Sequence, residues 1–560
     1  MTFTRWLRSV LAPRPASRAR PPARRLAVEL LEDRLTPSTG GLLDPTFGGG
    51  TGYALSSFTN HLDAANAVTV QSDGKIVVAG NTTASSSNTG QDFLVARYNA
   101  DGSPDTSFGT AGHTATDFYK LTDSAQAVAI QSDGKILAAG WANTSKGQNF
   151  ALARYNANGT LDTTFGSKGK VSTSLGGSIE AVESMAVQTN GQILVGGYEG
   201  GSGSAFFALA RYNANGTLDS TFGNGGKLIT NIQRANDVRS DSLVIQSDGN
   251  IVLAGTTVDP TSGQAEFVVA RFNANGTADT SFGSGGEAIT HVGSSSNHFG
   301  GLALQSDGKI VVSGDAFTGS TTDLCLVRYN ADGTLDATFG ASGNGIVTVP
   351  PPTGLTSVSA RGSGVEIQLD GKIVAGGAVF NSSGGSAQQW SFGAARVNAD
   401  GTVDSSYGNG GWTTVEMGYA DYLQASTLQP DGRLLLAGSA QPTSNTFPTD
   451  VALIRFLESA PQIGSFTANP NPVTSGNSLT LTASNITDGN PNSTITQVTF
   501  YYFDSNGNKV VLGTGTEDSS GNWNLTFTVN LTAGTYTIYA QAEDNYGVLG
   551  DPDSLSLTVN

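Results

Sequence analysis

Arginine and aspartate are the chemically active residue types that recur at a fixed spacing in this chain. Each arginine stands in a string of the type Phe-x-Leu-Ala-Arg-Tyr-Asn, and each aspartate in a string of the type Leu-Asp-x-Thr-Phe-Gly. A carboxylate beside a guanidinium can serve acid–base chemistry, but a pair that recurs in every repeat cannot mark one active site. We therefore predict a structural role, in which Asp162 caps or braces a joint and Arg154 bridges neighbouring repeats. The arginines are Arg97, Arg154, Arg211, Arg271, Arg328, Arg396 and Arg455, and the aspartates are Asp44, Asp105, Asp162, Asp219, Asp279, Asp336 and Asp404.

The usual catalytic signatures are absent from the sequence. Gly-x-Ser-x-Gly, His-Glu-x-x-His, paired Cys-x-x-Cys and the phosphate-binding glycine loop do not occur. The single cysteine, Cys325, takes the place of an alanine in sister repeats, so we expect a packed thiol rather than a nucleophile. His291 and His298 are expected to be solvated loop residues, and none of the four histidines has metal-ligand spacing. We predict no catalytic residue, no metal site and no cofactor.

Function is therefore expected where the repeats differ. The loops between the second and third strands vary in length and are rich in Ser, Thr, Gly and Asn, and variable loops on a rigid scaffold often carry binding. Trp141 and Trp390 lie in two of them, where each indole can stack on a sugar or pack beneath the loop. Charges outside the repeat pattern could also converge at one mouth of a channel. The loops are Asn81–Asp92, Trp141–Asn149 and Ala378–Ser391, and the charges are Glu180, Glu183, Arg234, Arg239 and Glu366.

The composition indicates a turn-rich β protein. Of 560 residues 73 are glycine, and charged residues make up 13 %, which is about half of the usual quarter. No apolar run approaches the ~20 residues of a membrane helix, so no transmembrane segment is predicted. The net charge of −17 would repel phosphate backbones, which disfavours nucleic acid as a partner.

An internal repeat of about 60 residues organises the chain. The string Gln-Ser-Asp-Gly-Lys-Ile and its variants begin at Gln71, Gln131, Gln188, Gln246, Gln305, Gln368 and Gln429. This string, the arginine string and the aspartate string each occur seven times, and a fixed period of this length indicates a repeat architecture.

Each repeat is expected to form four short strands. In the second repeat, residues 127–130 and 136–139 flank an Asp-Gly turn, which we predict to be type I′. A third strand is expected at Phe150–Tyr155, and a remaining strand around Lys170–Thr173, ahead of the next hairpin. Four strands repeated seven times predict a seven-bladed β-propeller, with an open β-solenoid as the alternative.

The two ends of the repeat region complement each other. A copy of the aspartate string, around Asp44, precedes the first repeat, while the last repeat ends after Arg455 without one. The early copy can fill the missing joint and so close a ring.

The repeat strings resemble the bacterial delta-60 repeat family. The resemblance rests on the hairpin Gln-Ser-Asp-Gly-Lys-Ile-Val-Val-Ala-Gly, the strand Ala-Arg-Tyr-Asn and the joint Leu-Asp-x-Thr-Phe-Gly, over about residues 43–457. The sixth repeat departs most, at 368–372 and 405–408. The resemblance implies an uncharacterised propeller of large exported proteins, and it brings no catalytic residues.

The two ends of the chain differ from the repeats. Residues 1–39 are rich in Arg and Pro and are predicted to be a disordered export leader. Within it, Leu-Glu-Asp-Arg-Leu-Thr-Pro-Ser resembles the N-terminal motif of planctomycete surface and secreted proteins, which implies export; a basic leader with a chance helix is the alternative. After a linker at 458–461, residues 462–560 are predicted to form an immunoglobulin-like β-sandwich that resembles bacterial domains of this kind. Tyr536 is expected to make a tyrosine-corner hydrogen bond or to be a core aromatic.

These features favour an exported or cell-surface scaffold without enzymatic activity. The propeller (40–457) would bind an extracellular glycan or surface protein through variable loops on one face, and the C-terminal domain would act as a spacer. Two alternatives stay open, a structural surface-layer component and a propeller enzyme that acts on glycans or uses a quinone.

Overall fold

The computed structural model describes residues 40–560 except 60–61, 84–89, 202–203, 235–241, 353–354, 356, 361–362, 382–388, 419, 442–448, 458–460, 489–492, 505–507, 546–548 and 551. The predicted leader, His61, Arg239 and most of the predicted linker thus lie outside the described residues. In this part of the chain the structure is built of β-strands, with one short 3-10 turn, η2 (Gly48–Gly50). No helix within these residues has the length and apolar character needed to cross a membrane.

The repeats form antiparallel sheets in chain order. The first three repeats contribute β2 (Asp63–Val70), β3 (Ile76–Thr82), β4 (Asp92–Tyr98), β5 (His113–Thr116), β6 (Asp123–Ile130), β7 (Ile136–Thr144), β8 (Gly147–Tyr155), β9 (Lys170–Thr173), β10 (Ile179–Val187), β11 (Ile193–Gly201), β12 (Ser204–Tyr212) and β13 (Lys227–Arg234). The next two contribute β14 (Ser242–Ile245), β15 (Ile251–Val258), β16 (Ala265–Phe272), β17 (Glu287–Thr290), β18 (His298–Leu304), β19 (Ile310–Phe317), β20 (Thr322–Tyr329) and β21 (Ile346–Val349).

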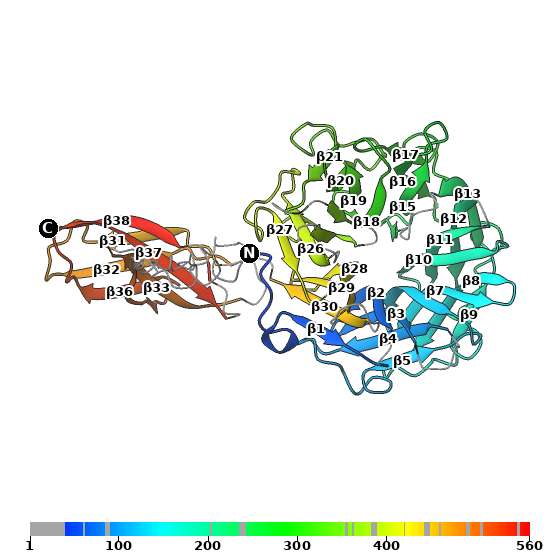
Figure 1. The fold of residues 1–560 in the computed structure, drawn as a ribbon, viewed down its shortest axis with the longest axis horizontal. Coiled ribbons are helices and arrows are strands. Elements are labelled where there is room, and N and C mark those ends of the chain that lie inside the picture. The colour runs from blue at the N-terminus through cyan, green and yellow to red at the C-terminus, as the bar shows by residue number, and fades with distance from the viewer. Residues whose placement is uncertain are drawn as a thin grey trace, which may run out of the picture. The chain divides into compact units, whose positions relative to one another are not determined.

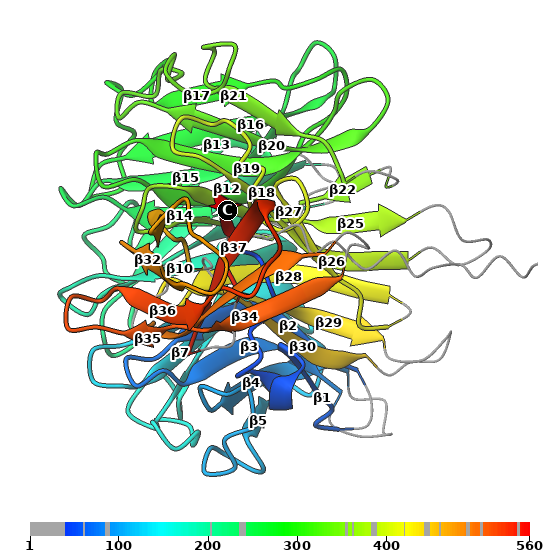
Figure 2. The same cartoon turned by 90° about the vertical axis from the view of Figure 1, so that its left-hand side faces the viewer.

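The sixth repeat is the most irregular. Its second strand is interrupted, and an extra strand, β22, pairs with β20 and β25; Figure 2 shows β22 and β25 at the same edge. Its strands are β22 (Ser357–Ser359), β23 (Val365–Ile367), β24 (Ile373–Gly376), β25 (Ala378–Asn381), β26 (Gln389–Val397) and β27 (Trp412–Val415). The last sheet holds β28 (Ala420–Leu428), β29 (Leu434–Gln441) and β30 (Asp450–Phe456), and its fourth strand is β1 (Tyr53–Ser56) from the start of the chain.

The second repeat shows how these sequences form strands. Residues 136–140 of β7 are all buried, because the sheet packs between two neighbouring sheets and has no solvated face. The prediction for the fourth strand was wrong in one respect: β9 hydrogen-bonds to β8, so it completes the sheet of the repeat that precedes it.

The turn of the β6–β7 hairpin also differs from the predicted type I′. Gly134 has a φ of 80°, whereas Asp133 is not among the positive-φ residues, and Gly134 N donates to Gln131 O at 2.9 Å. A three-residue loop that ends in one left-handed glycine explains this, since only its last residue needs a positive φ.

The innermost strands form a closed circle. Each contacts the next in the order β2, β6, β10, β14, β18, β23 and β28, and β28 contacts β2 (Figure 1). Separate hydrophobic cores fill the spaces between neighbouring sheets, and one of them joins the last sheet to the first. The expected closure is present, because β1 pairs with β30 along its whole length.

Residues 461–560 form two four-stranded antiparallel sheets around one core. Along β32 and β37 buried residues alternate with more exposed ones, as expected where one face packs on the other sheet. Tyr536 packs at the edge of this core, and its hydroxyl donates to Thr532 O at 3.0 Å, the bond of a tyrosine corner. The sheets are β31 (Ser465–Asn469), β32 (Ser478–Ser484), β36 (Trp523–Thr528) and β35 (Thr516–Glu517), and β34 (Lys509–Thr514), β33 (Ile495–Phe503), β37 (Gly534–Asp544) and β38 (Asp553–Val559).

Candidate functional site

The repeated Arg–Asp pair is a joint between repeats. Arg154 Nε donates to Asp162 Oδ2 at 2.9 Å, and Arg154 Nη1 donates to Ala214 O, in the turn of the next repeat, at 2.5 Å. Asp162 Oδ1 accepts bonds from the backbone N–H and hydroxyl of Thr164, and the Arg154 guanidinium lies over the Phe165 ring. The prediction that Asp162 caps the joint and Arg154 bridges repeats is confirmed.

The same pairing closes the circle. Arg455 Nε donates to Asp44 Oδ2 at 2.7 Å, and Arg455 Nη1 donates to Ala100 O of the first repeat at 2.5 Å. Arg433 also reaches Asp44, at 2.6 Å. Two cations therefore meet one fully buried carboxylate at this joint. Asp44 keeps a lowered pKa although burial acts to raise it, because Thr46 and both arginines stabilise the charged form.

Several of the innermost strands share a bulge, and the residue that stands at this bulge differs between repeats. The register of β2, β6, β10 and β28 shifts around Asn66, Gln126, Glu183 and Gln424, each of which stands five residues before the glutamine of its hairpin. A bulge turns a side chain out of the alternation of its strand. These four side chains line one cavity of about 320 Å³.

The rest of the cavity wall comes from Ser124 of β6 and from the second and third strands. The second strands contribute Asn81, Trp141 and Tyr198, and the starts of the third strands contribute Gln91, just before β4, and Gln148, within β8. The cavity thus belongs to the last, first, second and third repeats, whose strands lie side by side around the centre in Figure 1.

Hydrogen bonds order the polar wall between the first two repeats. Asn66 Nδ2 donates to Ala125 O at 2.9 Å and to Asn81 Oδ1 and Ser124 Oγ at 3.3 Å each. Gln126 Nε2 donates to Ser124 Oγ at 3.2 Å. Such a network fixes the positions of amide groups that can both donate to and accept from a ligand.

One carboxylate and two aromatic rings complete the chemistry of the cavity. Glu183 is the acidic residue of the wall, and the Arg234 guanidinium lies 4.2 Å from the centre of the Tyr198 ring. Trp141 is half-buried, so part of the indole is available for contact. Amides and aromatic faces suit a neutral ligand rich in hydroxyl groups, since amides bond to hydroxyls and rings pack on C–H faces.

The other charged residues that were singled out from the sequence lie at different places in the structure. Glu180 is buried and accepts bonds from the N–H groups of the 175–177 loop, so it has a structural role. Glu366 lies in β23 and accepts a bond from Ser426 Oγ of the next repeat at 3.1 Å; burial raises its pKa to about 8. Among the charges that lie in the described part of the chain, Glu183 is in the wall of the cavity, and the Arg234 guanidinium lies over the ring of Tyr198.

The predictions for the single cysteine and for the histidines had different outcomes. Cys325 is 1 % exposed and burial raises its thiol pKa, which confirms a packed role. The expectation for His298 was wrong, because it opens β18 and its Nδ1 lies 2.6 Å from Asp315 Oδ1 across the sheet. His291 lies in the loop that follows β17, as expected, but it is only partly exposed, with Nδ1 3.7 Å from Glu266 Oε1.

The predicted variable loops are described in part. Residues 144–146 of the second loop line an outer cleft of about 560 Å³ together with Tyr119 and Leu121. Trp390 packs its ring 5.0 Å from that of Phe380, against the core between the sixth and last repeats. For Trp390 the packing alternative therefore holds, whereas Trp141 faces the central cavity.

Comparison with known proteins bears on the repeats. Six segments match a family described as a domain of unknown function (DUF5122) beta-propeller, at residues 71–108, 131–165, 188–222, 246–282, 305–339 and 368–407. The chain is a β-propeller repeat protein. No curated protein matches the sequence.

Solved structures with a likeness to the chain are remote. The polysaccharide lyase Uly1 is 10 % identical with a TM-score of 0.37, over 75 % of this chain and 97 % of the lyase. A glucose dehydrogenase is 12 % identical with a TM-score of 0.32, over 59 % of this propeller protein and 95 % of the dehydrogenase. A mannose phosphorylase from Leishmania mexicana is 9 % identical with a TM-score of 0.27, over 48 % and 81 % respectively. Values this low carry no argument about activity.

Proposed function

We propose that this propeller protein is an exported or cell-surface binding protein without enzymatic activity, and that it holds a neutral carbohydrate in the central cavity. The amide-rich wall around Asn66, Gln126 and Gln424 is the observation that carries the proposal. Six amide side chains line a space of about 320 Å³, which is near the lower limit for ligand pockets.

The chemistry of the wall favours binding over hydrolysis. Hydrolysis of a glycosidic bond ordinarily uses two carboxyl groups on opposite sides of the bond. Among the described residues that line the cavity, Glu183 is the single carboxylate. The outer cleft beside Tyr119 and the 144–146 loop offers a second surface for a longer glycan or a surface protein.

We further propose the finer architecture that this function requires. The circle of innermost strands corresponds to seven blades of the delta-60 type, and the joint at Asp44 supports closure of the ring. The two-sheet domain of residues 462–560 is proposed to be an immunoglobulin-like spacer, which the tyrosine-corner bond of Tyr536 supports. Residues 1–39, with their planctomycete-type motif, are proposed to direct export.

Binding to a glycan array, followed by calorimetric titration of the best ligand, tests the carbohydrate proposal. Gln126→Ala and Trp141→Ala should each weaken binding by about 5- to 30-fold, since each removes a contact worth ~1–2 kcal/mol. Ser363→Ala is the matched control, because Ser363 holds the same repeat position as Gln126 but does not line the cavity. Equal loss in the control, or binding that is indifferent to both cavity variants, would place the ligand elsewhere.

A further inference from the structure

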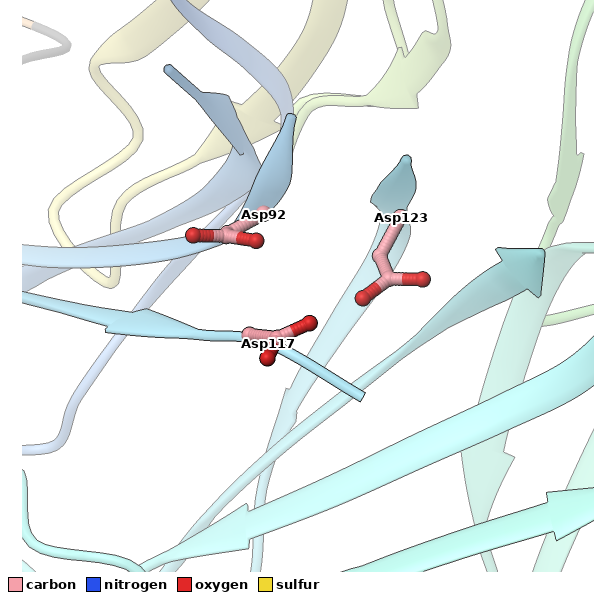
Figure 3. A group of neighbouring side chains, drawn as sticks. All are labelled: Asp92, Asp117 and Asp123. Carbon is pink, nitrogen blue, oxygen red and sulfur yellow. The ribbon is translucent and has the colours of Figure 1, made fainter. Parts of the chain in front are cut away.

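Three aspartates meet where the first and second repeats join. Asp92 opens β4, Asp117 follows β5, and Asp123 opens β6. One carboxylate oxygen from each lies within 4.8 Å of the others, and Figure 3 shows an oxygen of Asp123 pointing toward Asp117. Asp123 is fully buried, while Asp92 and Asp117 are partly exposed, so the group is open to solvent on one side.

The two neighbouring joints provide an internal comparison. Between the last and first repeats the matching residues are Asp450, Ser57 and Asp63, and between the second and third repeats they are Asn149, Ser174 and Glu180. Thus the position of Asp117 is a serine in both neighbours. Ser174 Oγ donates to Glu180 Oε1 at 3.1 Å, whereas Asp117 places a third carboxylate at that point.

The buried acid itself is satisfied in the neighbouring joint but not in this one. Asp63 Oδ1 accepts bonds from the hydroxyls of Thr59, at 3.0 Å, and Thr82, at 2.6 Å. The residues that match these two threonines in the second repeat are Tyr119 and Ala142, which cannot supply those bonds.

The lack of these two hydroxyl donors affects one oxygen of the Asp123 carboxylate. Asp123 Oδ2 accepts from Phe118 N at 2.8 Å, but Asp123 Oδ1 is buried without a hydrogen-bond partner. A buried oxygen of this kind, in a carboxylate that faces two further carboxylates, is a position for a ligand that supplies positive charge.

No Lys, Arg or His in the described part of the chain forms an ion pair with these carboxylates. Among the described residues, none of the ion pairs includes Asp92, Asp117 or Asp123. The nearby ammonium of Lys170 donates to the backbone carbonyl of Asp117 at 2.8 Å. Burial, together with the neighbouring carboxylates, raises the pKa of Asp123 to about 7 and that of Asp92 to about 6.

We propose that Asp92, Asp117 and Asp123 bind one Ca²⁺ ion that clamps the first repeat to the second. Oxygen-only ligands of irregular arrangement suit Ca²⁺, whereas Zn²⁺ prefers nitrogen and sulfur and Mg²⁺ demands a near-ideal octahedron. Two oxygens on opposite sides of a Ca²⁺ ion are about 4.8 Å apart at Ca–O distances of about 2.4 Å, so the three carboxylates can share one ion.

Calorimetric titration of the full chain with CaCl₂, after treatment with EDTA, tests the site. The wild type should bind one Ca²⁺ at this joint, and its melting temperature should rise with Ca²⁺. Asp117→Ser and Asp92→Asn install the residues that stand at these positions in the next joint, so both variants are expected to fold. Each should weaken the binding by about 100-fold and remove the thermal shift.

The matched control is Asp450→Asn, which removes the acid at the position of Asp92 from the joint in which Ser57 replaces the third aspartate. It should keep the full response to Ca²⁺. The proposal is wrong if the wild type shows no Ca²⁺-dependent heat or stabilisation at pH 7.5, since the three acids would then share protons instead. It is also wrong if Asp117→Ser and Asp92→Asn bind as well as the wild type, or if MgCl₂ binds as tightly as CaCl₂.

Discussion

Replacement of Asp44 by alanine should lower the free energy of unfolding more than the same replacement of an aspartate that is paired with a single arginine. Asp44 is fully buried and accepts bonds from Arg455 Nε at 2.7 Å and from Arg433 Nη1 at 2.6 Å. Its loss leaves the Arg455 guanidinium without its carboxylate and removes one of the two carboxylates of Arg433, which keeps its ion pair with Asp431. Removal of one partner from a buried ion pair costs about 3–5 kcal/mol of unfolding free energy.

Asp279 provides the matched comparison. It makes the same bond to Arg271 Nε, at 2.7 Å, but the two side chains are 13 % and 12 % exposed. Water can replace part of the lost interaction, so Asp279→Ala should cost about 1.5–3 kcal/mol, the range for a hydrogen bond to a charged group.

Urea titrations and thermal scans of both variants, followed by tryptophan fluorescence and far-UV circular dichroism, measure the difference. Asp44→Ala should show the larger fall in the unfolding midpoint. A cost below about 1 kcal/mol for Asp44→Ala, or an equal cost for both variants, would refute the argument that burial and the second arginine set the strength of the closing joint.

The remaining predictions test other parts of the molecule. Because the pKa of Glu366 is raised from 4.5 to about 8, the folded state holds a proton that the unfolded state releases, so stability should fall as pH rises between these values, by at most ~5 kcal/mol. Glu366→Gln should flatten this fall in melting temperature between pH 5 and 8.5; an unchanged slope would contradict the assignment. Deletion of residues 40–48 removes the closing joint and should lower the melting temperature, whereas an unaltered melting curve would make the segment a mere linker. Cys325 is buried and should react with a thiol reagent only after unfolding, so rapid reaction of the native chain would be inconsistent with its packing. A reporter fused behind residues 1–45 should leave the cytoplasm of a planctomycete host, and retention would argue against export.

The repeat and its joints could be predicted from the sequence because the seven copies within the chain can be compared with one another. Arg154 and Asp162 lie eight residues apart on adjoining segments, so their contact is local and the spacing predicts it. The contact between Arg455 and Asp44 joins the two ends of the repeat region. It could be predicted because the aspartate string has one copy before the first repeat and none after the last.

Of the cavity residues, Glu183 and Trp141 were singled out from the sequence, and Asn81, Gln91 and Gln148 fell within the predicted variable loops, but the residues of the innermost strands other than Glu183 were missed. Asn66, Gln126 and Gln424 do carry a signal, since they are polar residues within an apolar strand at one fixed distance before the hairpin. A strict two-residue alternation hides them, because the bulge that turns them inward breaks the alternation.

Contacts that depend on strand register or on the packing of one sheet against another could not be predicted. His298 meets Asp315 only because β18 and β19 pair in one particular register. Asp92 and Asp123 belong to different sheets, and their approach follows from the packing of one repeat on the next rather than from any spacing along the chain.

The pairing of β1 with β30 also determines when the ring can close during synthesis of the chain. Residues 53–56 leave the ribosome almost 400 residues before their partners at 451–454. At about 5–20 residues per second, this interval lasts roughly 20–80 s. Throughout it the first strand has no edge to join, and the ring is a row of sheets with two open ends. Completion of the fold must therefore await the last repeat, which makes closure a late, long-range step and leaves both ends of the incomplete ring accessible to a chaperone until β30 has been made.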